Sequence, residues 1–296
     1  MYKMNVNVLE LVKKLEIGLQ ILAENKIMST YRRVFRGKGL EFEEYRAYGP
    51  GDDAEMIDWK ASIRSNQTLV KQFREERELD IYFLVDASSS MVFGSTDKLK
   101  NEYAAEFVAS LAHFILRVGD NVGLVMFNDN VVHNLPAANG SNQFYMLLRG
   151  LVDPSLYGGG YNLEEAIRFI IRSVQKKGLL IIVSDFIGLR AGWEKILRLA
   201  TGKFDVIGVM VRDPRDRELP RGVGQVMISD PYTGKTMLVN PDEVGPAYEN
   251  YVKRYEAMVE AGFAASKADL IKLATDKSFI KPVINYFRRR ELIFSS

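Results

Sequence analysis

The sequence contains no cysteine, and only two of its 296 residues are histidine. Without cysteine the chain has no disulfide, no thiolate nucleophile and no zinc or iron–sulfur site built on cysteine. The two histidines, His113 and His133, leave little material for histidine-based metal binding or acid–base catalysis. Several common classes of enzyme site are therefore excluded by composition.

Strong charge of one sign and long apolar runs are also missing. The 40 basic and 38 acidic residues nearly balance, which argues against a nucleic-acid or membrane-surface footprint over the whole molecule. No apolar run approaches the roughly 18 to 20 residues needed to span a bilayer. Lys13, Lys14 and Glu16 interrupt the stretch in which a signal peptide has its apolar core. We expect a cytoplasmic protein without a transmembrane segment or a nucleic-acid ligand.

Residues 1–77 are predicted to form an N-terminal helix and a charged extension, followed by a larger domain over residues 78–296. The region from 29 to 77 is polar and strongly charged, and Thr68–Phe73 alternates as a strand does. The apolar residues near the start follow a four-three spacing, which lays one stripe along an amphipathic helix. These residues are Val8, Val12, Leu15, Leu19 and Leu22.

A short helix is predicted inside the extension. Asp52 has Glu55 three positions later, which is the pattern of an N-cap residue with its capping box. The helix would then run through Ile57, Trp59 and Ile63.

From residue 79 onward, apolar strands alternate with amphipathic helices. This alternation is typical of an α/β fold in which a doubly wound, mainly parallel sheet carries helices on both faces. An edge hairpin over 225–229 and 236–239 is expected next, and then a tail that is helical to about Arg290. The predicted strands are Ile81–Val85, Val122–Phe127, Leu179–Val183 and Phe204–Val211, with helices near 98–118, 142–151, 162–176 and 191–200.

The clearest chemical signal is the loop Asp86–Ser90, of sequence Asp-Ala-Ser-Ser-Ser, which begins where the strand Ile81–Val85 ends. Open α/β sheets bind ligands beyond the carboxyl ends of their strands. Alternate residues of an extended loop can point the same way, so Asp86, Ser88 and Ser90 can present hard oxygens to one ion. Such ligands suit octahedral Mg²⁺ or Mn²⁺, with water completing the shell.

Two further segments are expected beside this loop. The strand Leu179–Val183 ends at Ser184 and Asp185, and adjacent strand ends would place Asp185 opposite the first loop. Between the two lies Gly158–Asn162, of sequence Gly-Gly-Gly-Tyr-Asn. Glycine lets this backbone approach a neighbouring loop closely.

These blocks resemble the von Willebrand factor A-like family catalogued as domain of unknown function fifty-eight. One block runs from Gly51 through Ile57–Ser62 to Val70–Glu76 and is similar to that family's segment before the first sheet strand. The other resembles a metal-ion-dependent adhesion site (MIDAS), an Asp-x-Ser-x-Ser loop followed by a Gly-Gly-Thr-type loop and a later Asp. The resemblance covers most of the chain and implies a Rossmann-like, von Willebrand A-type fold.

The resemblance also implies a metal site. Ser88 and Ser90 would bind Mg²⁺ or Mn²⁺ directly, while Asp86 and Asp185 would hold it directly or through water. Tyr161 stands where the family presents a metal-binding Thr, and a phenol is a poor neutral ligand for a small hard ion.

Asn162 offers a carbonyl oxygen as a substitute ligand. Such a site leaves the ion with an open position that a partner's Glu or Asp can complete. We therefore expect a non-enzymatic, metal-dependent protein–protein interaction module. The resemblance implies MoxR-type AAA+ ATPases as partners, in the assembly or activation of other proteins.

One alternative is that Tyr161 leaves the metal loop vestigial and the extension alone binds the partner. Asp58, Trp59 and Lys60 are then the candidate partner-binding residues. A simpler explanation of Trp59 is that it packs the extension onto the sheet, because tryptophan buries a large area wherever it can.

The other alternative is an enzyme. Haloacid dehalogenase-like phosphatases also begin with an apolar strand that ends in Asp, which would be Asp86 here and would accept the phosphoryl group. Their general acid is an Asp two residues later, and this sequence has Ser88 there. The glycines at 158–160 lack the Lys-Ser/Thr ending of a phosphate-binding P-loop.

Overall fold

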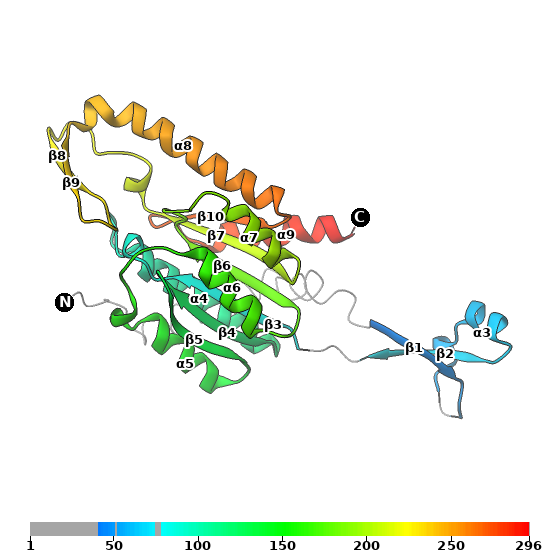
Figure 1. Cartoon of the computed structure of the whole chain (residues 1–296). Coiled ribbons are helices and arrows are strands. Elements are labelled where there is room, and N and C mark those ends of the chain that lie inside the picture. The colour runs from blue at the N-terminus through cyan, green and yellow to red at the C-terminus, as the bar shows by residue number, and fades with distance from the viewer. Residues whose placement is uncertain (1–40, 51, 75–77, 296) are drawn as a thin grey trace.

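The computed structural model describes residues 41–50, 52–74 and 78–295. The predicted N-terminal helix over residues 8–22 lies outside these ranges. Figure 1 shows a small unit built on β1 and β2 and, from Asp80, an α/β domain around a six-stranded sheet. The domain division after residue 77 stays a prediction. Among the helices of the described ranges, none is long and apolar enough to cross a membrane.

The central sheet has the strand order β10-β7-β6-β3-β4-β5. All neighbouring strands pair in parallel except β4 and β5, which are antiparallel. The four predicted strands are confirmed, and their continuous apolar runs suit strands that are buried on both faces. The strands are β3 (Asp80–Asp86), β4 (Asn121–Phe127), β5 (Val131–Ala138), β6 (Gly178–Ser184), β7 (Phe204–Arg212) and β10 (Asp269–Ala274).

Helices cover both faces of this sheet, each over its own buried cluster. One cluster joins the sheet to α4 (Lys100–Val118), α5 (Ser141–Leu151) and α9 (Ile280–Ser295). The other joins it to α6 (Leu163–Ser173), α7 (Trp193–Thr201) and α8 (Pro241–Ala265). The predicted doubly wound, Rossmann-like α/β fold with a mainly parallel sheet is confirmed.

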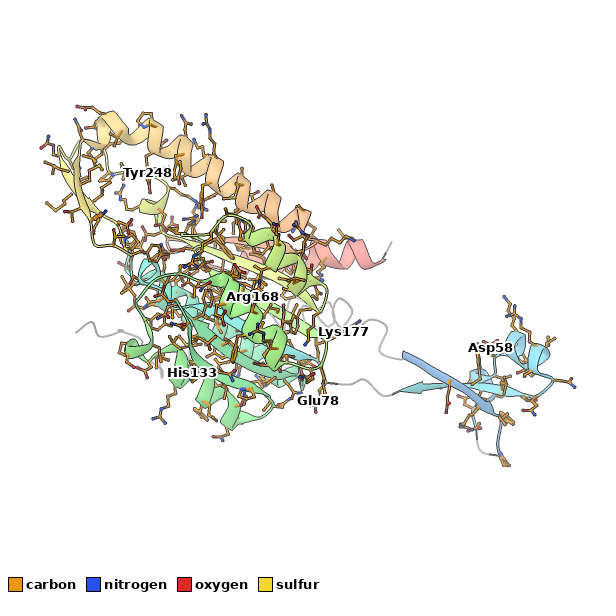
Figure 2. All side chains as sticks on the ribbon, in the orientation of Figure 1. Asp58, Glu78, His133, Arg168, Lys177 and Tyr248 are labelled. Atoms are coloured by element: carbon orange, nitrogen blue, oxygen red, sulfur yellow. The ribbon has the colours of Figure 1, made fainter. Side chains whose placement is uncertain are left out.

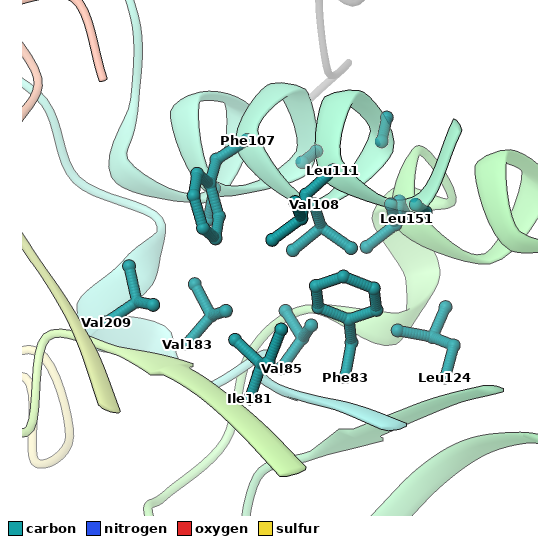
Figure 3. Close-up of a cluster of buried hydrophobic side chains, with 14 of the residues drawn as sticks. Phe83, Val85, Phe107, Val108, Leu111, Leu124, Leu151, Ile181, Val183 and Val209 are labelled. Atoms are coloured by element: carbon teal, nitrogen blue, oxygen red, sulfur yellow. The ribbon is translucent and has the colours of Figure 1, made fainter. Parts of the chain in front are cut away.

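Alternate residues of the strands face opposite clusters. Figure 3 shows Phe83 and Val85 of β3 beside Phe107 and Val108 of α4, whereas Leu84 belongs to the cluster on the other face. Burying one such side chain stabilises the fold by about 1.5–3 kcal/mol. This packing holds the carboxyl end of β3 rigidly in the middle of the sheet.

The C-terminal region corrects one expectation. It is not continuously helical, because β10 lies between α8 and α9 and pairs with β7. Ile271 and Leu273 are buried while Lys272 is exposed, a two-residue period that belongs to a strand. Lys267, with φ of 57°, turns the chain out of α8 before the strand begins.

The hairpin is confirmed as β8 (Val226–Ser229) and β9 (Thr236–Val239). Its predicted place at the edge of the main sheet is wrong, because it forms a two-stranded sheet of its own and the edges of the central sheet are β5 and β10. Figure 1 shows this hairpin beyond the N-terminal end of α8.

In the extension, β1 (Glu41–Ala47) and β2 (Leu69–Arg74) pair antiparallel, and α3 (Trp59–Ser65) lies in the connection between them. The predicted cap at Asp52 is wrong. A bridge between Ile57 and Val70 keeps the chain extended there, so the helix begins later, capped by Asp58, which accepts hydrogen bonds from the backbone of residues 60 and 61.

Candidate functional site

The carboxyl ends of β3 and β6 bring the predicted site residues together. Asp86 accepts a hydrogen bond from Ser184 Oγ at 2.6 Å and another from the Ser88 backbone nitrogen at 2.8 Å. We call Asp86, Ser88, Ser90, Ser184 and Asp185 the strand-end cluster; each is at most 2% exposed.

The two loop serines face the same point. A 3-10 turn over Ser89–Met91 follows β3 and leaves Ser88 Oγ and Ser90 Oγ 3.2 Å apart. The glycine loop approaches as expected: Gly158 donates to the Ala87 carbonyl at 2.7 Å, and its φ of 127° requires glycine. The Ser89 backbone nitrogen in turn donates to the Gly159 carbonyl at 3.0 Å, so two backbone bonds tie the serine loop to the glycine loop.

The donor set of this loop fits a small divalent ion. Oxygens in neighbouring positions of an octahedral Mg²⁺ shell lie about 3 Å apart, given bonds of about 2.0–2.1 Å. The separation of the Ser88 and Ser90 hydroxyls, 3.2 Å, is close to that value. The carboxylate of Asp86 adds a third hard oxygen beside them. Metal binding stays a prediction, and these three residues are the ones that would hold the ion.

Electrostatics set Asp86 apart from an ordinary carboxylate. Burial, followed by the nearby charge of Asp185, raises the pKa of Asp86 to about 7. The hydrogen bonds from Ser184 and Ser88 oppose this rise but do not cancel it. A cation beside Asp86 would favour its ionised form.

Asp185, the second predicted carboxylate, already has a cation. Lys100 Nζ lies 2.7 Å from Asp185 Oδ2 and 2.9 Å from Asp216 Oδ2, and Lys100 is 1% exposed. Burial disfavours the charge on Asp185, but Lys100 and Arg212 outweigh it and lower the pKa of Asp185. Burial likewise opposes the charge on Lys100, yet the two carboxylates raise its pKa. The role of Asp185 as a metal ligand stays a prediction.

Tyr161 and Asn162 lie beside the cluster in other roles. Tyr161 is 6% exposed and packs against Phe127, with ring centroids 5.7 Å apart. Its hydroxyl is 3.4 Å from Ser184 Oγ. The carbonyl oxygen of Asn162 accepts from the Glu165 backbone at 3.3 Å and so caps α6. Neither ligand role is tested by this arrangement.

Tyr232 is a site residue that the sequence analysis missed. It lies in the turn between β8 and β9, and its hydroxyl donates to the Ile187 carbonyl at 2.7 Å. The same oxygen is 3.0 Å from Ser90 Oγ. Lys100 was missed in the same way. No local pattern marks either residue, because their partners lie far away in the sequence.

The three predicted partner-binding residues of the extension, Asp58, Trp59 and Lys60, differ in their surroundings. Asp58 caps α3 and also accepts from the Tyr45 hydroxyl at 3.0 Å. Trp59 is 65% exposed, so the expectation that it packs the extension onto the sheet is wrong. Figure 2 shows Asp58 on the small unit, away from the central sheet. Trp59 and Lys60 remain available as surface contacts.

The geometry gives the enzyme alternative no support. Asp86 is fully buried, and both of its carboxylate oxygens accept hydrogen bonds, whereas a phosphoryl acceptor needs an open approach. In the part of the chain that the structure describes, no three His, Cys, Asp or Glu side chains gather as a metal-binding group.

Comparison with known proteins identifies a family. The profile described as "Protein of unknown function DUF58" matches residues 44–258. The uncharacterized protein Mb1516 of Mycobacterium bovis is 27% identical over 285 residues, covering 94% of this chain and 88% of that protein. The uncharacterized protein YeaD of Bacillus subtilis is 31% identical over 106 residues, covering 36% of this chain and 24% of that protein.

Solved structures with a related fold include the conserved hypothetical protein BatB from Bacteroides thetaiotaomicron. It has a TM-score of 0.47 and 17% identity, over 72% of this chain and 98% of that one. The VWA domain of SpRpn10 has a TM-score of 0.38 and 10% identity, over 71% of this chain and 95% of that one.

Proposed function

This chain belongs to the DUF58 family, and from that premise we propose that it is a non-enzymatic protein-interaction module. Its loop Asp86–Ser90 holds Mg²⁺ or Mn²⁺ and, through the ion, a carboxylate of the partner. The observation that carries this proposal is the pair of hydroxyls of Ser88 and Ser90, 3.2 Å apart beside Asp86 at the end of a central strand.

Each residue has a distinct part in this function. Ser88 and Ser90 contribute neutral hydroxyl oxygens, and Asp86 contributes the charge that attracts the cation. When bound, a divalent ion supplies an open coordination position for an anionic oxygen. Asp185 stays paired with Lys100, which limits the negative charge of the site and leaves the ion attractive to a partner's carboxylate.

The partner that we propose is a MoxR-type AAA+ ATPase. Family membership supports this choice, because the resemblance in the sequence implies such ATPases as partners.

We expect the chelator-stripped protein to bind Mn²⁺ or Mg²⁺ in a saturable way, and the Ser88→Ala/Ser90→Ala double variant to lose that binding by at least tenfold. The reason is that the double variant removes both neutral ligands while leaving the buried core intact. Isothermal titration measures the affinity.

Ser89→Ala is the matched control. Ser89 lies in the same turn and uses its backbone nitrogen, 3.0 Å from the Gly159 carbonyl, rather than its hydroxyl. Its affinity should equal that of the unmodified protein. Saturable binding that survives the double variant would place the ion elsewhere and overturn the proposed site.

A second candidate surface lies on α3. Trp59 is 65% exposed and Ile63 is 81% exposed, and residues four apart lie on one side of a helix. Lys60 and Arg64 are exposed beside them. An exposed Trp–Ile pair next to two cations suits a partner with an apolar groove and an acidic rim.

Two double variants separate the surfaces in one binding assay with a purified MoxR-type AAA+ ATPase. If the strand-end cluster binds the ATPase, Ser88→Ala/Ser90→Ala lowers the affinity at least tenfold and Trp59→Ala/Ile63→Ala leaves it unchanged. The reverse result would transfer the function to α3. Circular dichroism of both variants checks that the folds are equal.

A further inference from the structure

The hairpin of β8 and β9 contacts the strand-end cluster through its turn. Every residue from Met227 to Leu238 is exposed except Tyr232. The two strands have four residues each, and an isolated two-stranded ribbon is only marginally stable in water. The side chain of Tyr232 is therefore a main attachment of this ribbon to the domain.

The turn is shaped to present Tyr232. Asp230 Oδ1 accepts from the backbone nitrogens of Tyr232 at 2.8 Å and Thr233 at 2.9 Å, which fixes the turn. On the receiving side, Gly188 has a φ of 94° and no Cβ; a Cβ there would lie 3.2 Å from the ring of Tyr232. The phenol thus lies in a close-fitting position beside the cluster.

The hydrogen-bond chemistry of the Tyr232 hydroxyl follows from its partners. A carbonyl oxygen can only accept, so the single phenol proton goes to Ile187, 2.7 Å away. The phenol oxygen is then the acceptor for the Ser90 hydroxyl, at 3.0 Å. Ser90 therefore faces an oxygen lone pair, as it would face a ligand oxygen.

This oxygen lies at the distance from Ser90 Oγ that a ligand oxygen on the same ion would have. Neighbouring oxygens around an octahedral Mg²⁺ are about 3 Å apart, and the phenol oxygen lies 3.0 Å from Ser90 Oγ. It lies against Ser90, which is only 2% exposed. A partner's carboxylate cannot reach Ser90 while the phenol is there.

We propose that Tyr232 is an internal competitor, which occupies the position of the partner's carboxylate oxygen and closes the strand-end cluster until the hairpin moves away. The inference rests on the proposed metal-dependent function. Binding of the ion and of a carboxylate partner then requires release of the hairpin, so both are weakened by the stability of the Tyr232 contact.

Tyr232→Phe tests this competition, because it keeps the ring and removes the hydroxyl. Mn²⁺ affinity, measured by isothermal titration, should rise about tenfold, since two hydrogen bonds that hold the closed state are lost. Tyr232→Ala, which also removes the ring, should raise it at least as much.

Tyr255→Phe is the matched control. Tyr255 donates to the Phe186 carbonyl at 2.7 Å, one residue before the carbonyl that Tyr232 uses. The Tyr255 hydroxyl does not share the hydrogen bond that Tyr232 makes with Ser90. Removing the Tyr255 hydroxyl should therefore leave the Mn²⁺ affinity unchanged. If both phenols had only a structural role, Tyr232→Phe and Tyr255→Phe would change the Mn²⁺ affinity by similar amounts.

Hydrogen exchange of the backbone over residues 226–239 gives a second readout. Saturating Mn²⁺ should speed exchange there in the unmodified protein, because ion binding releases the hairpin. Equal Mn²⁺ affinity of the unmodified protein and Tyr232→Phe would overturn the competition and leave the metal site standing. Weaker binding by Tyr232→Phe would make Tyr232 a ligand instead, and no binding by any variant would remove the metal-dependent function together with its competitor.

Discussion

Replacing Lys100 by methionine is expected to destabilise the protein by about 3–5 kcal/mol, because the change removes the cation that is bonded to a buried carboxylate. Lys100 is 1% exposed and bonds both Asp185, which is fully buried, and Asp216. Methionine keeps much of the length of the side chain, so the loss reports the charge. Urea-induced unfolding followed by circular dichroism measures the free energy of unfolding.

Lys98→Met is the control on the same segment. Lys98 pairs with Glu106, but its side chain is 36% exposed, and such pairs contribute about 0–1 kcal/mol. Adding Asp185→Asn to Lys100→Met should recover part of the loss, because it removes one of the uncompensated charges. Equal stability of Lys98→Met and Lys100→Met would show that the buried pair does not stabilise the end of β6.

Replacing Tyr161 by threonine, the residue that the sequence resemblance implies at this point, is expected to cost about 3 kcal/mol of stability. Tyr161 is 6% exposed and belongs to the buried cluster that joins the sheet to α6, α7 and α8. Removing its ring leaves a cavity beside Phe127, and truncation of a large buried aromatic residue typically costs about 3–5 kcal/mol. Chemical unfolding in the presence of a chelator measures this loss without any contribution from metal.

Tyr161→Phe separates the ring from the hydroxyl. The hydroxyl makes one long contact, 3.4 Å from Ser184 Oγ, so its removal should cost less than about 1 kcal/mol. A threonine variant as stable as the unmodified protein would mean that the site can accept threonine without repacking. A phenylalanine variant as unstable as the threonine variant would assign the stabilisation to the hydroxyl.

Together these effects describe a site whose stability comes from residues other than the predicted ligands. Lys100 neutralises the end of β6, and Tyr161 fills the space beneath Ser184. The serine loop can therefore keep its geometry without a metal ion. In the closed state, however, the Ser90 hydroxyl is bonded to Tyr232, and both oxygens of Asp86 accept hydrogen bonds.

The strands of the central sheet were predictable because their signal is local. The strands β3, β4, β6 and β7 are buried on both faces, so each is a continuous apolar run that can be recognised from its own residues. The strand β10 was missed because its short alternating run lies between two amphipathic helices, and a short apolar segment does not by itself distinguish a strand from a helix. The start of α3 was missed because the bridge between Ile57 and Val70, a contact between separate segments, decides where the helix can begin.

The sequence alone determined the α/β class and the position of Asp86, Ser88 and Ser90 after a buried strand, since both depend on residues within a few positions of one another. Only the tertiary structure decided which groups meet them. Lys100 reaches Asp185 across 85 positions, and Tyr232 reaches Ser90 across 142. Such pairs form because helices and loops pack against one edge of the sheet, and neither spacing nor composition specifies which distant side chain that packing delivers.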